Sequence, residues 1–169
     1  MTVAEAITKS GITPSASYTG IETADDFVFA IQTESTQSKE TDWVVCADHV
    51  KEHSGALNAT TADEAFIRTG TVTSKTGTQR TFSINGNRCV GDAFQDFLLS
   101  RKIVFGIGSD VIVPYIYFSL RTGKGEKGSC SLVVTSDVGG AAGSPATFAC
   151  DVKGIGIPAE FNYITAAAG

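Results

Sequence analysis

The sequence is poor in charge, in long apolar runs and in histidine. Charged residues make up only 18% of the chain, against about 25% in a typical soluble protein. The longest apolar run, residues 111–118, is far shorter than the roughly 20 residues that a membrane-spanning helix needs. We therefore expect no membrane anchor. With two histidines in the whole chain, few groups are available for acid–base catalysis or as imidazole ligands.

Positive charge is also scarce, and the formal net charge is -5. Tight nucleic-acid binding depends on Lys and Arg that neutralise phosphates, so this balance argues against it, although the protein could lie near nucleic acid without gripping it. The first twenty residues lack a cationic stretch followed by an apolar core, so we expect no signal peptide. We expect a protein made in a cytoplasm, with its four cysteines reduced.

Threonine, serine, glycine and short alternating segments dominate what remains. The length of 169 residues fits a single domain over 1–169, with an extended N-terminal arm at 1–26 that contains short pieces of structure, and a flexible tail at 158–169. Period-two patterns predict strands without a βαβ rhythm, so we expect a mainly β fold, an antiparallel β-sandwich or barrel. The expected strands cover residues 26–33, 41–50, 66–74, 79–85, 111–121, 129–137 and 147–154.

One segment has helical periodicity. In residues 91–102, Phe94, Phe97 and Leu98 recur at i, i+3 and i+4, which predicts an amphipathic helix. We expect these three side chains to seat the helix on the sheet.

Two segments, a hairpin and a long loop, are candidates for surface roles. Residues 66–74 and 79–85 are expected to form a hairpin around a loop at 75–78, and their hydroxyl side chains would form a neutral polar sheet face. That face would consist of Thr69, Thr71, Thr73, Thr81 and Ser83. Residues 51–65 are polar and aperiodic, which predicts a long loop of the kind that is usually functional or mobile.

No catalytic or cofactor motif has the residues it requires. In "TGKGEKGSC", residues 122–130, Ser129 stands where a Walker A loop needs Lys, and a strand follows instead of a helix. We therefore interpret this loop as a hairpin tip. Cys46, His49 and His53 lack a C-x2-C partner, and on a strand Cys46 and His49 would point to opposite faces. We expect no enzyme activity, no metal and no cofactor.

Two longer segments resemble a known family. "NRCVGDAFQDFLLSRKIVFGIGSDVIVPYIYF" and "LRTGKGEKGSCSLVVTSDVGGAAG", roughly residues 87–143, are similar to the major tail tube proteins of long-tailed bacteriophages. The strand at 146–153 and its exit "GIGIPAEF" resemble them too. The likeness covers about the C-terminal half of the chain, whereas the N-terminal half fits in length and strand content.

The resemblance implies a structural virion protein with a β-sandwich or barrel flanked by a helix. Such proteins self-assemble into hexameric rings that stack into a tube around a tape-measure protein, and the tube later conducts DNA. Expected partners are other copies of the chain, the tape-measure protein, the tail terminator and distal-tail proteins. DNA would pass through without specific binding. The protein would be made in the host bacterial cytoplasm and reside in the virion tail.

The same resemblance gives the polar stretch 51–65 a role. Together with the arm at 1–20 and the tail, it would make contacts between rings. Its candidate contact residues are Lys51, Glu52, His53, Asn58, Asp63 and Glu64. The lumen would be lined by one of two hairpins, 66–85 or 111–135.

A binding module is the alternative function. A β-sandwich lectin-like or adhesin-like domain on a virion or cell surface would need exposed aromatic side chains to hold a sugar. Tyr115 and Tyr117 alternate along one predicted strand beside Pro114, and they would form that platform.

Overall fold

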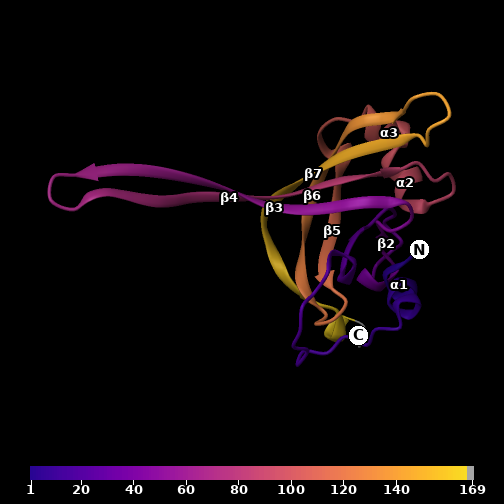
Figure 1. Ribbon diagram of the computed structural model, residues 1–169, viewed down its shortest axis with the longest axis horizontal. Coiled ribbons are helices and arrows are strands. Elements are labelled where there is room, and N and C mark those ends of the chain that lie inside the picture. Colours follow the sequence, from indigo (N-terminus) through magenta and orange to yellow (C-terminus); the bar gives the residue numbers. More distant parts are fainter. Residues whose placement is uncertain (167–169) are drawn as a thin grey trace.

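Seven antiparallel strands form one curled sheet in the computed structural model, which describes residues 1–166 (Figure 1). Along the sheet the order is β2-β1-β5-β6-β7-β4-β3, so β2 and β3, which follow each other in the chain, lie at opposite ends. The predicted mainly β, antiparallel fold with a flanking helix is confirmed. The strands are β1 (Phe27–Ile31), β2 (Val44–Val45), β3 (Val50–Phe66), β4 (Gly70–Asn87), β5 (Ile112–Ser119), β6 (Lys124–Gly139) and β7 (Thr147–Asn162).

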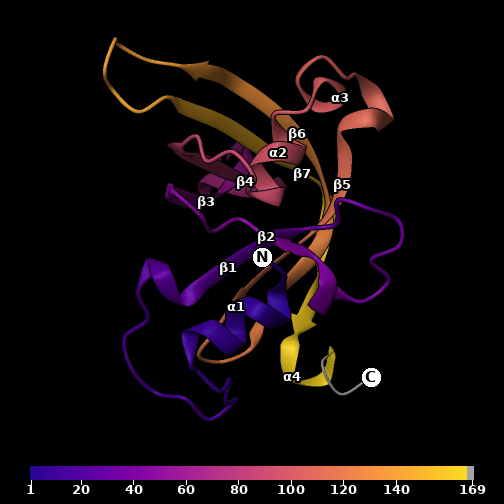
Figure 2. The ribbon, with the colours of Figure 1, turned by 90° about the vertical axis from the view of Figure 1, so that its right-hand side faces the viewer.

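Short helices cover the sheet. Helix α1 lies against one face near β1, and α2 and α3 lie near the upper ends of β6 and β7 (Figures 1 and 2). None of the helices in the described part of the chain is long and apolar enough to cross a membrane. The α-helices are α1 (Val3–Ser10), α2 (Ala93–Leu98), α3 (Arg101–Val104) and α4 (Tyr163–Ala166), and the 3₁₀ helices are η1 (Ala24–Asp26), η2 (Glu40–Asp42) and η3 (Gly108–Val111).

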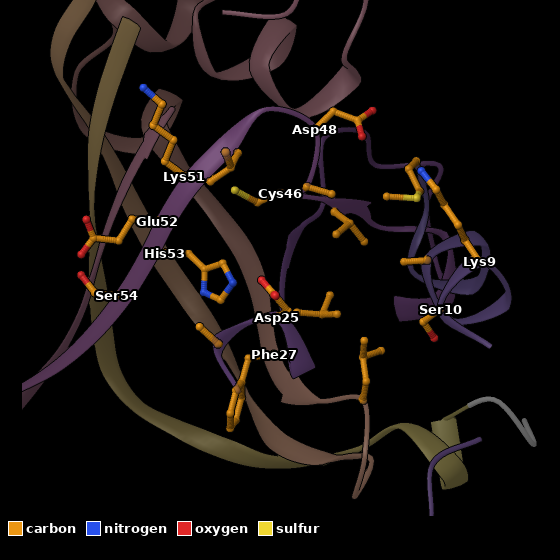
Figure 3. A pocket seen from close by; sticks show the side chains of 18 residues that line it. Lys9, Ser10, Asp25, Phe27, Cys46, Asp48, Lys51, Glu52, His53 and Ser54 are labelled. Carbon is orange, nitrogen blue, oxygen red and sulfur yellow. The ribbon is translucent and has the colours of Figure 1, made fainter. Parts of the chain in front are cut away.

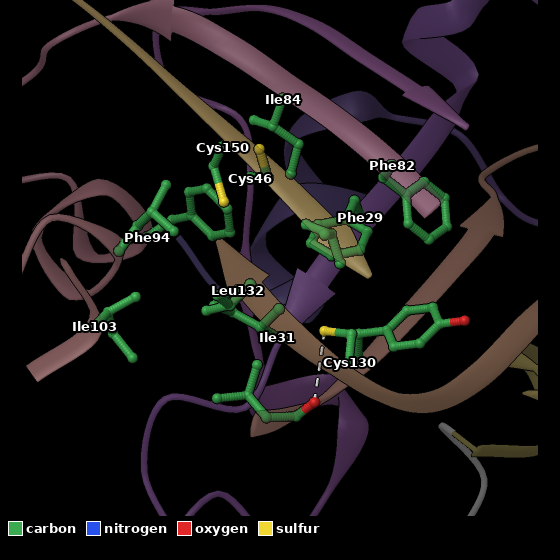
Figure 4. Packing of buried hydrophobic residues seen from close by; sticks show 14 of the residues in the cluster. Phe29, Ile31, Cys46, Phe82, Ile84, Phe94, Ile103, Cys130, Leu132 and Cys150 are labelled. Atoms are coloured by element: carbon green, nitrogen blue, oxygen red, sulfur yellow. Dashed lines mark hydrogen bonds between the residues drawn. The ribbon is translucent and has the colours of Figure 1, made fainter. Parts of the chain in front are cut away.

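Alternation along β1 divides the apolar residues between two cores. Phe29 and Ile31 are buried in the larger core with α2 and α3, whereas Val28 and Ala30 are buried on the opposite face with α1. Because successive strand residues point to opposite faces, a short strand buried on both sides reads as the continuous apolar run "FVFAI". Figure 4 shows the larger core, in which Cys130 Sγ donates to the Val113 carbonyl at 3.5 Å. That core also contains Phe82, Ile84, Phe94, Leu98, Leu132, Phe148, Cys150 and Val152.

The arm predicted at 1–26, with short pieces of structure, is wrong as an extended segment only in its first half, where Val3–Ser10 form α1. Thr2 Oγ1 accepts from the Glu5 N–H and Glu5 Oε2 accepts from the Thr2 N–H, forming a capping box. The helix ends at Gly11, whose φ of 66° suits a residue without a side chain. The T-x-x-E spacing and this glycine are the local signals for the helix.

The predicted tail at 158–169 is also wrong over most of its length. Strand β7 continues to Asn162, with Phe161 paired to Gly125 of β6 and buried on the α1 side, and α4 follows. Residues 167–169 lie outside the described part of the chain.

The helix predicted at 91–102 is two helices, with a break at Leu99 and Ser100. Asp92 Oδ2 accepts from the Gln95 N–H at 3.0 Å and begins α2. The Gln95 side chain is fully buried and bonds to the backbone of Cys89 and Asp48 instead of completing a capping box. Ser100, in an extended conformation, then begins α3.

Both predicted hairpin loops lie elsewhere than expected. The first hairpin turns at residues 67–69, and the predicted loop at 75–78 is part of β4. The second turns at residues 120–123, so most of the glycine-rich stretch 122–130 is strand β6. Glycine occurs both in turns and in strands that approach a neighbouring backbone closely. The sequence alone therefore did not show which of these glycines form the turn.

Candidate assembly surface

A long hairpin projects from the body of the protein (Figure 1). Strand β4 pairs with β7 only from Thr81 to Asn87, and β3 pairs only with β4. Residues 57–80, called the arm below, therefore form a two-stranded ribbon whose outer edges have no strand partner within the described chain. Such an isolated ribbon is marginally stable in water.

Apolar side chains are exposed near the tip of this arm. Every residue from 57 to 76 is exposed, including Leu57 (64%), Phe66 (50%) and the fully exposed Ile67. Val72 is paired with Glu64, and Phe66 is two residues beyond Glu64 on the same strand. Phe66 and Val72 therefore share one face of the ribbon. Free strand edges are usually blunted by Lys or Pro, but the arm contains one lysine and no proline. Its surface therefore favours association.

A polar cluster fixes the root of the arm. Arg80 lies just outside the last β4–β7 pair, and its Nε donates to Glu126 Oε1 at 2.7 Å. The guanidinium also stacks over the rings of Phe82 and Tyr117, 4.3 and 5.3 Å from their centroids. Tyr115 Oη donates to the same Glu126 oxygen at 3.1 Å. Burial, and after it the neighbouring Glu126 carboxylate, raises the pKa of Tyr115, so it remains a donor.

The residues predicted as a ring-contact loop lie on strand β3. Lys51, Glu52 and His53 are at its base, beside the body, whereas Asn58, Asp63 and Glu64 lie along the arm. The loop prediction was wrong because an exposed two-stranded ribbon buries neither face, so it needs no apolar alternation. Asn58 Nδ2 donates to Thr81 Oγ1 at 3.1 Å, across the root of the arm.

The predicted polar face is divided by a β-bulge. Thr60 pairs with Gly77 and Thr61 with Lys75, so Thr76 is an extra residue in β4. Thr71 and Thr73 consequently share a face with the core residues Phe82 and Ile84 further along the strand, whereas Thr81 and Ser83 lie on the other face. Thr69 is in the turn. The prediction that these five residues share one sheet face was therefore wrong, because an inserted residue reverses the alternation.

The three predicted helix-packing residues contact the larger core. Phe94 and Leu98 are fully buried in it, and Phe97 is partly buried against it. The Phe94 ring meets Phe29 edge-on, with centroids 6.4 Å apart. Helix α2 therefore covers the upper end of the sheet and stays clear of the arm (Figure 1).

The aromatic platform required by the alternative binding function is absent. Tyr115 is 1% exposed and stacks on Phe29 inside the core, and Tyr117 is partly buried between Phe27 and Phe82. Neither ring is free to hold a sugar, so this hypothesis loses its site.

The candidate metal ligands do not form a cluster. Cys46 is buried, and His49 is exposed on a turn with φ 58°. Within residues 1–166, no three His, Cys, Asp or Glu side chains are arranged to hold a metal ion.

The sequence prediction missed the arm tip, although 66–74 was expected to be a strand. Two bulky apolar residues, Phe66 and Ile67, immediately before the turn-forming "RTG" were the available signal. Bulky apolar side chains at a projecting hairpin turn do not pack into the chain's own core.

Solved structures share this architecture, among them two from gene transfer agent particles. One is the tail of an empty gene transfer agent particle with C6 symmetry, at TM-score 0.57 and 16% identity, covering 84% of this chain and 99% of that chain. The other is the virion of a native gene transfer agent particle, at TM-score 0.54 and 16% identity, covering 83% and 98%. No family model matches the sequence, and no curated protein matches it. The fold expected from the tail tube resemblance is thus matched over nearly the whole length of these chains, and the protein has the fold of a gene transfer agent tail protein.

Proposed function

We propose that this chain is a structural protein that self-assembles into hexameric rings, stacked as the tube of a virion tail or a tail-like particle. The observation that carries the proposal is the arm, residues 57–80, which exposes apolar side chains and two unpaired strand edges. Its fold neighbour from the empty gene transfer agent tail has C6 symmetry. A head-to-tail contact whose rotation closes generates a ring of this kind.

A second free edge supports ring formation. Beyond Lys153, β7 leaves β4 and pairs with β6 alone, so residues 154–162 offer backbone groups on one side. Ile157, on this stretch, is 95% exposed. Strand addition between copies would satisfy these groups and continue the sheet around a ring, which removes exposed edges altogether.

In this proposal the tube encloses a tape-measure protein and later conducts DNA. The net charge of -5 suits a conduit, because rows of Lys or Arg would hold phosphates through counterion release. The tube would end on tail terminator and distal-tail proteins, and each subunit would be made in the host bacterial cytoplasm. No step of this function requires a catalytic group, and we propose that the chain is not an enzyme.

Negative-stain electron microscopy of the purified, concentrated protein tests the proposal. Rings with sixfold symmetry, or hollow tubes made of them, are the expected particles. Sedimentation at increasing concentration gives an independent readout, because a self-assembling chain shifts to larger species. A chain that remains a monomer at every concentration, in the presence of preformed tail-tip complexes as nuclei, would contradict the proposal.

A further inference from the structure

A recess of about 820 Å³ lies where the two ends of the sheet face each other (Figure 3). Strand β1 forms one side and the base of β3 forms the other, since residues 46–49 link β2 directly to β3 across the open end of the sheet. Helix α1 contributes Ala6 and Lys9 to the wall. The main lining residues are Phe27, Val28, Val45, Val50, His53 and Leu120.

The β1 side of the recess is a strand edge that leaves the Phe27 carbonyl without a strand partner. The Asp26 carbonyl accepts from the Leu120 N–H on the β5 side, whereas the Phe29 carbonyl accepts from the Cys46 N–H on the opposite side. Alternation therefore directs the Phe27 carbonyl away from β5 and toward the recess, whereas the Phe27 N–H donates to the Ala24 carbonyl at the end of η1. Strand β2 does not reach the Phe27 carbonyl, because it pairs with β1 only at Ala30 and Ile31.

The β3 side presents a buried polar atom without a partner. His53 Nδ1 is inaccessible to solvent and has no hydrogen-bond partner in the described chain. Figure 3 shows its ring in the space between β3 and β1, beside Asp25 and Phe27. Buried polar groups are nearly always hydrogen-bonded in native proteins. The unpaired His53 Nδ1 and the Phe27 carbonyl, which has no strand partner, thus both indicate that a segment with hydrogen-bonding groups is missing from the recess.

The chain itself provides a segment that matches these requirements. The arm tip, residues 66–70, combines Phe66 and Ile67 with the hydroxyl and backbone groups of the turn. The arm tip cannot reach the recess of its own chain. About twelve strand residues, or roughly 40 Å at 3.3 Å per residue, separate the tip from the root of the arm. A second copy can reach the recess, and the contact is then head-to-tail, with donor and acceptor on every subunit.

We propose that this recess receives the arm tip of a second copy of the chain. The inference rests on the proposed function and names the acceptor of the arm. In the contact, Phe66 and Ile67 cover the apolar wall at Val28 and Leu120, while backbone or hydroxyl groups of the turn pair with His53 Nδ1 and the Phe27 carbonyl.

Site-directed crosslinking between two differently substituted chains tests the contact. One chain carries Ile67→Cys at the arm tip, and the other carries Ala24→Cys at the exposed rim of the recess, both in a Cys89→Ser background. The two are mixed under assembly conditions and treated with a short bismaleimide. Ile107→Cys, which is 82% exposed and does not line the recess, replaces Ala24→Cys in the control mixture.

We expect the Ile67–Ala24 mixture to yield crosslinked dimer at least tenfold above the Ile67–Ile107 mixture. Equal yields in the two mixtures, or none in either, would overturn the inference. Electron microscopy of the same mixtures separates the two proposals. Rings or tubes without the specific crosslink remove the recess as acceptor and leave the proposed function standing, whereas the loss of assembly in the unsubstituted chain counts against both.

Discussion

Arg80 and Glu126, 46 positions apart in the sequence, form an ion pair at the point where the arm leaves the sheet. The side chains are only 14% and 23% exposed, so the pair is largely withdrawn from water. Arg80 stands next to Thr81, the last β4 residue paired with β7, and Glu126 lies on β6. The pair thus connects the arm to a strand that is not its neighbour in the sheet, which fixes the direction in which the arm projects.

Replacing Glu126 with Gln is expected to destabilise the protein by about 2 kcal/mol, because the partly buried guanidinium of Arg80 loses its counter-charge. The amide oxygen of the new side chain can still accept the hydrogen bond from Tyr115. Urea denaturation followed by circular dichroism measures the change. Lys153→Met provides the control, since it breaks the more exposed Lys153–Asp151 pair, and exposed pairs contribute at most about 1 kcal/mol. Equal effects of the two substitutions would contradict the role of the Arg80 pair.

The parts of the fold that are buried on one face could be predicted from sequence. Phe148, Cys150 and Val152 occupy alternate positions of one strand, and all three are buried. The apolar spacing of Phe94 and Leu98 likewise indicated a helix, although not the break after Leu98. In these segments one face of the strand or helix must be apolar to be buried, so the spacing of apolar residues in the sequence predicts the packing.

Only part of the arm could be predicted in this way, since 66–74 and 79–85 were expected to be strands but 51–65 was expected to be a loop. Residues 57–66, the β3 side of the arm, are exposed on both faces of the ribbon, so their sequence has no apolar alternation that would indicate a strand. The bulge at Thr76 also moved Thr71 and Thr73 to the other face from Thr81, and nothing in "SKTGT" shows which residue is inserted. The recess lies between strands from the two ends of the sheet. A single sequence does not show which strands pair, so it could not predict that these strands face each other.

Gly125 is expected to tolerate no side chain. A β-carbon at this position would overlap the Tyr117 carbonyl oxygen and the Phe118 Cα, so β5 and β6 would have to separate. We expect Gly125→Ala to cost about 3 kcal/mol or more, measured as a loss of soluble, cooperatively unfolding protein. Gly77→Ala is the matched control on the arm, where the nearest atom is 3.8 Å away. If both alanine variants unfold at the same temperature as the unsubstituted chain, the close crossing at Gly125 is wrong.

Thiol reactivity is expected to distinguish Cys89 from the other three cysteines. Burial raises the pKa of Cys46 and Cys130, and it raises the pKa of Cys150 to about 12. Since the thiolate is the reactive form, these three should resist alkylation in the folded protein, whereas Cys89 is only partly buried. Mass spectrometry after brief iodoacetamide treatment should show one modification per folded chain, at Cys89, and four in concentrated guanidinium chloride. Rapid labelling of Cys130 in the folded chain would contradict the core packing.

Acid is expected to weaken the attachment of β1 to the turn after β5. Asp26 accepts from the Thr23 N–H at 2.9 Å and from Arg121 Nε at 2.8 Å. The backbone bond from Thr23, assisted by Arg121, holds the pKa of Asp26 below its usual value. A lowered folded-state pKa gives stability that is present above the unfolded pKa of about 4 and is lost as pH falls through the folded pKa.

Asp26→Asn should therefore reduce stability at neutral pH and flatten its decline between about pH 5 and pH 2. Thermal denaturation at a series of pH values measures both effects. Arg121→Met should reproduce part of the loss at neutral pH, because it removes the second donor while the bond from Thr23 remains. An Asp26→Asn variant with the pH dependence of the unsubstituted chain would show that this carboxylate is not stabilised by folding.

Substitution at the arm tip is expected to abolish assembly while leaving the fold intact. Ile67 is fully exposed and contributes nothing to either core, so Ile67→Asp should change the free energy of unfolding by no more than about 0.5 kcal/mol. In an assembled tube, however, the same aspartate would be buried without a partner, which is strongly unfavourable. Ala142→Asp adds the same charge on the exposed turn between β6 and β7 and serves as the control. Sedimentation should find the Ile67 variant as a folded monomer at concentrations where the Ala142 variant and the unsubstituted chain form large particles. If the Ile67 variant assembles as readily as they do, the arm tip is not an assembly contact, and the ring must be held together through other surfaces such as the free edge of β7.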